Sequence, residues 1–229
     1  MEEIAVSLKE LIKRYFLFFI SVVFQGIAIA LITFANIGTT PISSANYVLS
    51  LHSAFTLGET TLIFNILLMI LQVMFISIGK DPLKKHAVNL LMQIPVCLIF
   101  SGMIDLAMNL LRVSLPEEIS YILSWILVVS GTVLLALAVS MSVTSNVAMV
   151  PGEYFIKIFH PLVNRTFSFV KTFFDIFLVS SAVILSLFLT GFTQIEAVRE
   201  GTLFAALCTG PIVHFFIPLT AKLKTMLQR

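Results

Sequence analysis

A short motif that occurs twice, 110 residues apart, constrains the fold of this chain more than any other feature of its sequence. Residues 36–41 read Asn-Ile-Gly-Thr-Thr-Pro, and residues 146–151 read Asn-Val-Ala-Met-Val-Pro. Polar residues are costly inside a bilayer, so their coincidence with the prolines in both copies is informative. A sequence that repeats itself across two halves predicts the repeat architecture found in many membrane transporters.

The composition of the chain places it in a membrane. Charged residues make up 11% of the sequence and apolar residues 59%, with a mean hydropathy of +1.05. Soluble domains carry about 25% charged residues, so this chain cannot cover a water-facing surface. We therefore predict an all-α polytopic membrane protein whose first partner is the lipid bilayer. A net charge of only +2 gives no reason to expect nucleic acid as a partner.

Six apolar segments are long enough to cross the membrane, since about 20 helical residues span about 30 Å of hydrocarbon. Two further apolar segments, 42–55 and 152–163, are shorter, and each follows directly on one copy of the Asn…Pro motif. Proline suits the first turn of a helix, so we expect each of these segments to be a short helix that begins near the proline. The six long segments are 15–35, 59–79, 88–111, 119–142, 169–190 and 202–221.

The basic residues favour six crossings with two short re-entrant helices, because short cytoplasmic loops collect Lys and Arg. If the short helices enter and return on one side, 12 of the 14 basic residues lie in the cytoplasm together with both termini. If all eight segments cross, only 10 of the 14 basic residues lie in the cytoplasm and 4 lie outside. The preferred topology is two inverted repeats, each with three transmembrane helices and one re-entrant helix. The alternative is eight crossings with parallel repeats.

This topology divides the chain into three parts. Residues 1–14 are predicted to form an amphipathic helix at the membrane interface, because apolar residues fall on one face and charged residues around the rest. Residues 15–111 form the first predicted repeat, and residues 112–229 form the second. In inverted repeats the two Asn…Pro turns would enter from opposite sides and meet near the middle of the membrane.

We expect a binding site between these two turns. Irregular backbone at membrane depth is tolerated where it lines a wet cavity, and helices that begin at Pro41 and Pro151 would direct their amides toward it. The alternative is that the polar residues cap ordinary surface turns. Acidic residues in the second half could couple transport to an ion, or could simply pair with lysines four residues away. The candidate substrate-binding residues are Asn36, Thr39, Thr40, Ser43, Asn65, Gln93, Asn146, Glu153, Asp175 and His214.

The function expected from these features is transport. The sequence contains no metalloprotease, nucleophile-elbow or phosphate-loop motif, so we do not expect an enzyme, and no cofactor or metal site is predicted. We expect a secondary transporter or permease for a small polar or anionic solute, which works by rocking one half against the other. The sequence leaves open whether transport is coupled to a proton or a cation. It also leaves open whether the protein forms a homo-oligomer. The alternative function is a non-transporting subunit or regulator that acts with a partner membrane protein.

Three short motifs resemble those of the YczE/YitT-type bacterial integral membrane proteins. They are Ala35-Asn-Ile-Gly-Thr-Thr-Pro41, Gly58-Glu-Thr-Thr at the start of the second long segment, and the late Gly201-Thr…Thr209-Gly-Pro211-Ile run. That family typically has an aromatic and an acidic residue just after the first proline, where this chain has Ile42 and Ser43. The resemblance implies a multi-pass protein of the bacterial cytoplasmic membrane, with transport as the expected activity.

Overall fold

The computed structural model describes residues 8–79, 82–116 and 118–227, with side chains up to residue 222. Within this part of the chain the structure is entirely helical, with eight α-helices and no strand. The helices are α1 (Leu8–Phe34), α2 (Pro41–Leu51), α3 (Leu57–Ile78), α4 (Leu83–Ser114), α5 (Tyr121–Ser145), α6 (Pro151–Leu162), α7 (Phe167–Leu189) and α8 (Glu200–Leu227).

Six of these helices are long and apolar enough to cross a membrane, which confirms the predicted number of long spans. The other two, α2 and α6, have only 11 and 12 residues. At about 1.5 Å per residue each is about 18 Å long, well short of the ~30 Å of a hydrocarbon core. Pro41 and Pro151 occupy the first position of these helices, where the missing amide hydrogen costs no intrahelical bond.

The first helix begins at Leu8 and continues without interruption to Phe34. Residues 8–14, which were predicted to lie at the membrane interface, belong to this continuous helix, and residues 1–7 lie outside the described residues. The buried residues of α1 begin only at Leu17. The first turns of α1 are therefore covered less by protein than the remainder of the helix.

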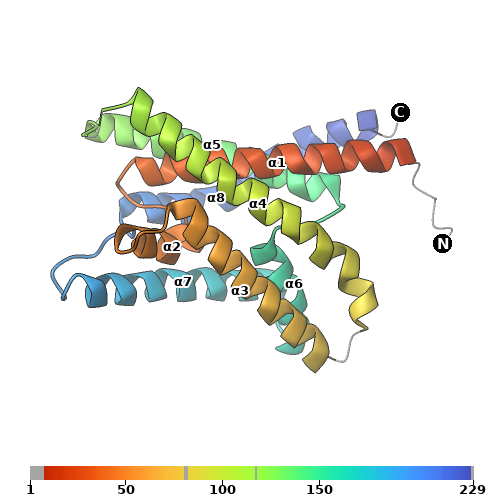
Figure 1. The fold of residues 1–229 in the computed structure, drawn as a ribbon. Helices are drawn as coiled ribbons and strands as arrows, with labels where there is room; N and C mark the ends of the chain where they lie inside the picture. Colours follow the sequence, from red (N-terminus) through yellow and green to blue (C-terminus); the bar gives the residue numbers. More distant parts are fainter. Residues whose placement is uncertain (1–7, 80–81, 117, 228–229) are drawn as a thin grey trace.

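The long helices alternate in direction along the bundle. Figure 1 shows α1, α4 and α7 running toward one end and α3, α5 and α8 running toward the other. Helix α1 ends and α3 begins at the same end of the bundle, so α2 does not carry the chain across. Helix α1 starts and α8 finishes at the opposite end.

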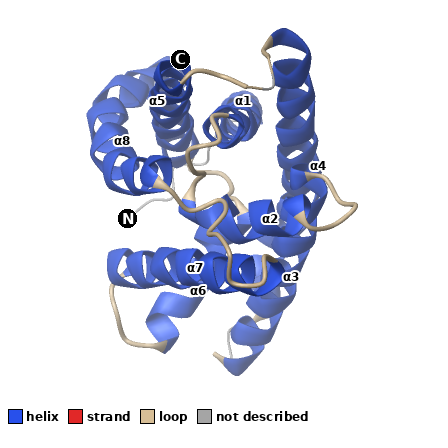
Figure 2. Cartoon of the chain, turned by 90° about the vertical axis from the view of Figure 1, so that its left-hand side faces the viewer, coloured by secondary structure: helices blue, strands red, loops and turns tan. Residues whose placement is uncertain are grey.

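The helices pack in two groups, and each group draws on both halves of the chain. In one group α1 packs against α4 and α5, and α5 packs against α8. In the other, α2 and α6 each pack against α3 and α7. Figure 2 shows α1, α5 and α8 together on one side, α3, α6 and α7 on the other, and α2 between them. Helices α3 and α4 join the two groups, whereas α7 and α8 make at most a slight contact within the described residues.

Glycines allow the central helices to approach one another closely. A Cβ atom on Gly131 of α5 would lie 2.7 Å from Cγ1 of Ile32 in α1. A Cβ atom on Gly26 of α1 would lie 2.9 Å from Cβ of Met103 in α4. In lipid there is no hydrophobic drive between helices, so van der Waals packing at such close contacts is what holds them together.

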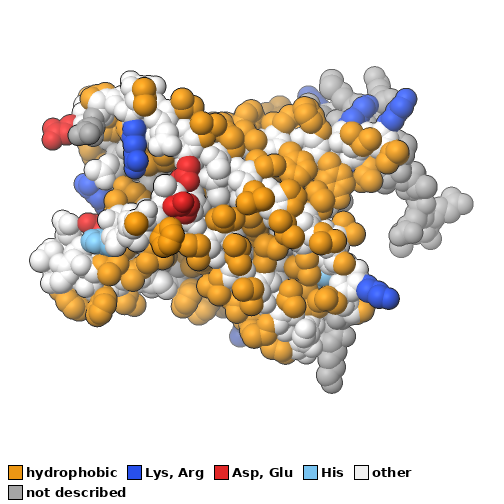
Figure 3. Space-filling model, viewed as in Figure 1, with side chains coloured by type: hydrophobic (Ala, Val, Ile, Leu, Met, Phe, Trp, Pro, Cys, Tyr) orange, Lys and Arg blue, Asp and Glu red, His pale blue; other side chains and the backbone are white. Residues whose placement is uncertain are grey.

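Hydrophobic side chains cover the middle of the molecular surface. Figure 3 shows them across one face, with the Asp and Glu side chains gathered at the end where α1 finishes. Large apolar side chains such as Leu91 and Ile184 are 65% and 69% exposed. A surface of this kind would associate in water, whereas lipid tails accept it. The chain is therefore a multi-pass membrane protein.

Candidate functional site

The two asparagines of the repeated motif follow their helices with the same backbone conformation. Asn36 has a φ of 55° and Asn146 a φ of 49°, the left-handed region in which Asn is the commonest residue after Gly. Asn146 is the C-terminal cap of α5, and the Asn36 amide donates to the carbonyl of Thr33 at 3.2 Å. Both side chains are exposed. This backbone conformation explains why Asn recurs, and a role of its side chain in binding stays a prediction.

The first turn is anchored on the start of α8. The Gly201 amide donates to the carbonyl of Ile37 at 2.7 Å, and the Thr39 amide donates to Thr202 Oγ1 at 3.1 Å. Gly38 has a φ of 127°, and a Cβ atom there would lie 2.5 Å from Thr202 Oγ1. Two of the motifs singled out in the sequence are thus in direct contact. Sequence analysis missed Thr202 as a site residue, although the Gly-Thr pair of the late motif carried the signal.

The predicted hydroxyl residues of the first turn form a buried group. Thr39 Oγ1 lies 2.5 Å from Thr33 Oγ1, and Thr40 Oγ1 donates to Ser43 Oγ at 3.0 Å. Thr39, Thr40 and Ser43 are each no more than 3% exposed. Each of these hydroxyls therefore has at least one hydrogen-bond partner within the protein and keeps capacity for another.

The two short helices meet at their first turns. A Cβ atom on Gly152 of α6 would lie 2.6 Å from Cδ1 of Ile42 in α2. These residues occupy the same place in the two copies of the motif, directly after the proline. The N-terminal ends of α2 and α6, which carry partial positive charge and amides without intrahelical partners, therefore approach each other through the Ile42 side chain.

Glu153 lies in the first turn of α6, close in sequence to this junction. Its side chain is half-buried, makes no hydrogen bond with another described residue, and interacts electrostatically with Lys171 of α7. The predicted pairing with Lys157 is not formed, because the Lys157 ammonium lies over the ring of Tyr154, 5.9 Å from its centroid. Glu153 is thus the one predicted acid that is not neutralised by a direct ion pair.

The other two ionisable candidates lie away from the junction. Asp175 accepts a hydrogen bond from Lys171 Nζ at 3.0 Å, which confirms the pairing predicted from their spacing. His214 is exposed on α8. Among the described residues, no three His, Cys, Asp or Glu side chains are arranged to hold a metal ion.

A row of buried polar side chains on α3 and α4 has atoms without hydrogen-bond partners. Six of their side-chain nitrogen and oxygen atoms are buried and have no partner among the described residues. None of the five side chains is more than 4% exposed. Asn65 and Gln93 were predicted as site residues, and the other three were not. This polar row consists of Thr61, Asn65 and Gln72 on α3 and of Gln93 and Ser101 on α4.

The unpartnered atoms of the polar row need a hydrogen-bond partner to offset the cost of their burial. One unsatisfied buried polar group costs about 1–3 kcal/mol. A hydrogen-bonding solute or water that reaches these atoms would remove the cost. The polar row is therefore a candidate surface for contact with a polar solute.

A helical spacing in the sequence could have revealed the missed members of the row. The buried residues of α3 recur at helical intervals, and Thr61, Asn65 and Gln72 all lie on that one face. Taken one at a time, Thr61 and Gln72 give no signal. Taken together with Asn65 by helix face, they make the protein-facing stripe of α3 unusually polar.

Asp105 holds the start of α3 close to α4. It accepts hydrogen bonds from Thr56 Oγ1 at 2.6 Å and from the Gly58 amide at 2.8 Å. Thr56 and Glu59 form a capping box at the first turn of α3. A Cβ atom on Gly58 would overlap the Asp105 carboxylate. These contacts explain the Gly-Glu-Thr-Thr motif, in which Gly admits α4 and Glu closes the cap.

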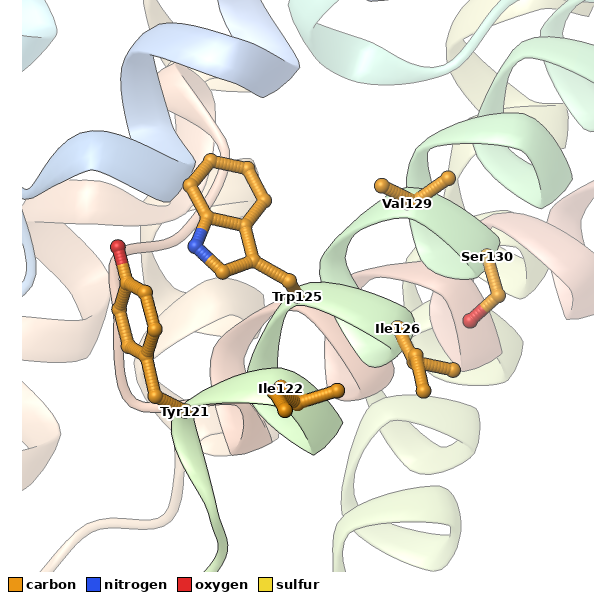
Figure 4. Close-up of a pocket in the computed structure, with 6 residues that line it drawn as sticks. All are labelled: Tyr121, Ile122, Trp125, Ile126, Val129 and Ser130. Atoms are coloured by element: carbon orange, nitrogen blue, oxygen red, sulfur yellow. The ribbon is translucent and has the colours of Figure 1, made fainter.

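An open apolar hollow on α5 is separate from these polar residues. Its volume is about 600 Å³. Figure 4 shows Tyr121 and Trp125 at one end of the hollow and aliphatic side chains along the helix. Trp125 also packs edge-on against Phe204 of α8, with ring centroids 5.6 Å apart. An almost wholly apolar lining suits a lipid chain better than a polar solute. The lining residues are Tyr121, Ile122, Trp125, Ile126, Val129 and Ser130.

Comparison with known proteins bears on the family of this chain. Searches of the curated proteins and of the solved structures found no match. A model of a family of unknown function, DUF6198, matches residues 12–218. The matched segment runs from α1 into α8 and so contains both Asn…Pro turns, the junction of the short helices and the polar row. The chain belongs to the DUF6198 family.

Proposed function

We propose that the protein is a secondary transporter or permease for a small polar or anionic solute. The observation that carries this proposal is the contact between Ile42 and Gly152, which joins the first turns of α2 and α6. Paired helix N-termini attract polar and anionic groups through their free amides and partial positive charge. Hydroxyl residues of the first turn and Glu153 of the second would surround a solute at this junction.

Helix direction and packing support the inverted-repeat architecture within this proposal. The corresponding helices α1 and α5, α3 and α7, and α4 and α8 run in opposite directions (Figure 1). The contact of α1 with α4 corresponds to that of α5 with α8, and the contact of α3 with α6 corresponds to that of α7 with α2. Ile42 and Gly152 are equivalent residues, and equivalent residues touch where a two-fold axis passes. We infer a pseudo-two-fold axis in the membrane plane at this contact.

The packing also suggests which parts would move during transport. Each helix group contains helices from both halves, so the moving bodies would be the two groups rather than the two halves of the sequence. The extensive contact of α3 with α4 would act as the hinge. The groups would separate on the side of α7 and α8, which make at most a slight contact within the described residues.

Charge distribution and the family resemblance support a location in the bacterial cytoplasmic membrane. Lysines and an arginine cluster where α1 starts, where α3 leads to α4, and where α6 leads to α7. By the positive-inside rule that end faces the cytoplasm, together with both ends of the chain. The similarity of the three motifs to the YczE/YitT-type proteins supports the bacterial assignment. The basic residues at this end include Lys9, Lys13, Lys84, Lys85 and Arg165.

Ion coupling would involve Glu153. An acid without a direct ion pair in the first turn of α6 is positioned to bind a proton or a cation as the solute binds nearby. Asp175 is held by Lys171 and has less freedom to take that role. Replacing Glu153 with Gln should therefore reduce gradient-driven accumulation more than passive exchange of the same solute, as measured in proteoliposomes with and without an imposed pH gradient.

Solute flux into proteoliposomes tests the proposal. Purified protein would be reconstituted, and uptake of labelled glycerol, urea, lactate and phosphate would be compared with protein-free liposomes. Gly152→Leu fills the junction, because even a Cβ atom there comes within 2.6 Å of Ile42. Gly102→Leu is the matched control, since nothing lies within 4 Å of a Cβ atom at that position. We expect flux with the native protein and the control, and a loss of flux in Gly152→Leu.

Absence of flux for every probe would count against transport and favour the alternative function. In that case the protein would be a non-transporting subunit or regulator, and a partner membrane protein should copurify with it from native membranes. Equal flux in Gly152→Leu and Gly102→Leu would instead place the pathway away from the junction of the short helices.

A further inference from the structure

We propose that the polar row on α3 and α4 extends the solute-binding site from the junction of the short helices, and that it selects an uncharged solute with both hydrogen-bond donors and acceptors. This inference rests on the proposed function and narrows its solute class. The row presents unpaired donors at Asn65 and Gln93, and unpaired acceptors at Gln72 and Gln93. The hydroxyl of Thr61 can serve in either role.

The polar row extends through much of the membrane thickness. The Gly58 amide bonds to Asp105 at 2.8 Å and sets the register of the two antiparallel helices. From that contact, at about 1.5 Å per residue, Thr61 and Ser101 lie about 5 Å inward along their helices. On the same scale Gln72 and Gln93 lie about 20 Å inward. The members of the row on the two helices are therefore matched in depth.

The row is connected to both short helices. Gln72 Nε2 donates to the carbonyl of Pro151 at 2.9 Å, which ties the deep end of the row to the first turn of α6. Near the other end, Thr60 Oγ1 donates to the carbonyl of Asn46 in α2 at 3.1 Å. A solute that moves along the row would therefore pass both α2 and α6. The row also lies where α3 of one helix group meets α4 of the other.

The charges around the row exclude ions as its preferred ligands. None of its five members is ionisable. Carboxylates lie near both ends, with Asp105 beside Gly58 and Glu153 two residues from Pro151, so an anion would meet like charge at entry and exit. A cation would be attracted to these carboxylates at the ends but would have no counter-charge along the middle of the row, and such burial is costly. An uncharged solute such as a polyol or a small amide meets neither obstacle.

The second half of the chain does not repeat this surface. At the offset of 110 residues, Gln72 corresponds to Ala182, Gln93 to Leu203 and Ser101 to Pro211. Thr61 and Asn65 correspond to Lys171 and Asp175, which pair with each other. The repeat accounts for the arrangement of the helices, whereas the unpaired polar side chains of the row have no equivalents in the second half.

The test compares two threonines that are both buried but differ in bonding. Thr61→Val removes a hydroxyl with no partner, and Thr132→Val removes one that donates to the carbonyl of Val128 at 2.7 Å. Gln93→Leu is the second variant of the row. In proteoliposomes, fluxes of glycerol and urea would be compared with that of lactate, an anion close in size to glycerol. The melting temperature of each variant would be measured in detergent.

We expect the native protein to carry glycerol or urea but not lactate. Thr61→Val and Gln93→Leu should each reduce that flux about tenfold, the equivalent of about 1.4 kcal/mol, without lowering the melting temperature. Thr132→Val should leave the flux unchanged. If Thr61 and Gln93 only hold helices together, their replacement should lower the melting temperature, and that result would overturn the inference. Unchanged flux in these two variants would overturn it as well. Lactate flux without glycerol or urea flux would overturn the uncharged class but leave transport standing. No flux of any probe would overturn both.

Discussion

Gly58 shows how a single residue links a sequence motif to the arrangement of helices. Its amide donates to Asp105, and a Cβ atom at this position would overlap both the Asp105 carboxylate and the Ser101 carbonyl. Helices α3 and α4 can come this close only because α3 has no side chain here. Since this contact joins the two helix groups, Gly58 influences the fold far beyond its own turn.

A Gly58→Ala change should lower the free energy of unfolding by about 1–3 kcal/mol, the usual cost of overpacking. Gly102→Ala in α4 is the matched control, because nothing lies within 4 Å of the added Cβ atom. There the better helix propensity of Ala should leave the stability unchanged or raise it by about 0.5–1 kcal/mol. Denaturant unfolding in detergent measures the free energy of unfolding of both variants. Equal stabilities would contradict the close approach of α3 and α4 at this glycine.

At the scale of the helices, the repeated motif is a compact way to end a long helix and begin a short one. Asn in the left-handed region ends α5, and proline begins α6 five residues later. The same sequence of events links α1 to α2. The two short helices then meet through Ile42 and Gly152. The motif thus determines both the reversal of the chain and the place where the two halves touch.

Substitutions of Asn146 separate its backbone role from a binding role. Asn146→Gly preserves the left-handed turn and should keep both stability and transport, because the asparagine side chain is exposed. Asn146→Ala should lower the free energy of unfolding by about 1 kcal/mol, since a Cβ atom disfavours this backbone conformation. Thermal unfolding measures the stability of each variant, and solute flux into proteoliposomes measures its transport. Loss of flux in a stable Asn146→Gly protein would show that the amide side chain contacts the solute.

Hydropathy and proline were sufficient to predict the helices, because both act locally along the chain. The segment predicted at 59–79 is the helix Leu57–Ile78, and the short segment predicted at 42–55 is the helix Pro41–Leu51. Helix α4 begins at Leu83, earlier than the predicted start at residue 88, because hydropathy stops at Lys84 and Lys85 although the helix continues beyond the apolar core.

The polar row could not be predicted in the same way, because it depends on which helices become neighbours. Gln72 and Pro151 lie 79 residues apart in sequence and are joined by a hydrogen bond. The significance of Gln93 likewise depends on the absence of a described partner for its amide, which no property of the isolated sequence reveals. Residue-by-residue inspection predicted two members of the row, and helical spacing could add Thr61 and Gln72, whereas the pairing of α3 with α4 depends on tertiary packing.

At the scale of the whole molecule, the proposed transporter combines a pseudo-symmetric arrangement of helices with polar chemistry that differs between its halves. Both halves supply helices to each packing group, whereas the buried unpaired polar atoms of the row belong to α3 and α4. The proposed transporter therefore needs its two short helices to enter from opposite sides of the membrane. If both entered from the same side, their first turns would not meet and a shared pathway could not form.

Cysteine accessibility at two linker positions tests this topology most directly. Phe55→Cys, after α2, and Val163→Cys, after α6, would be made separately in a Cys97→Ala, Cys208→Ala background. The native side chains at these positions are 52% and 40% exposed, so both should react readily. Sealed membrane vesicles of known orientation would be treated with a membrane-impermeant maleimide. We expect the two cysteines to be labelled from opposite sides of the membrane. Labelling of both from the same side would mean that α2 and α6 cross the membrane, and would contradict the inverted architecture and the proposed pathway.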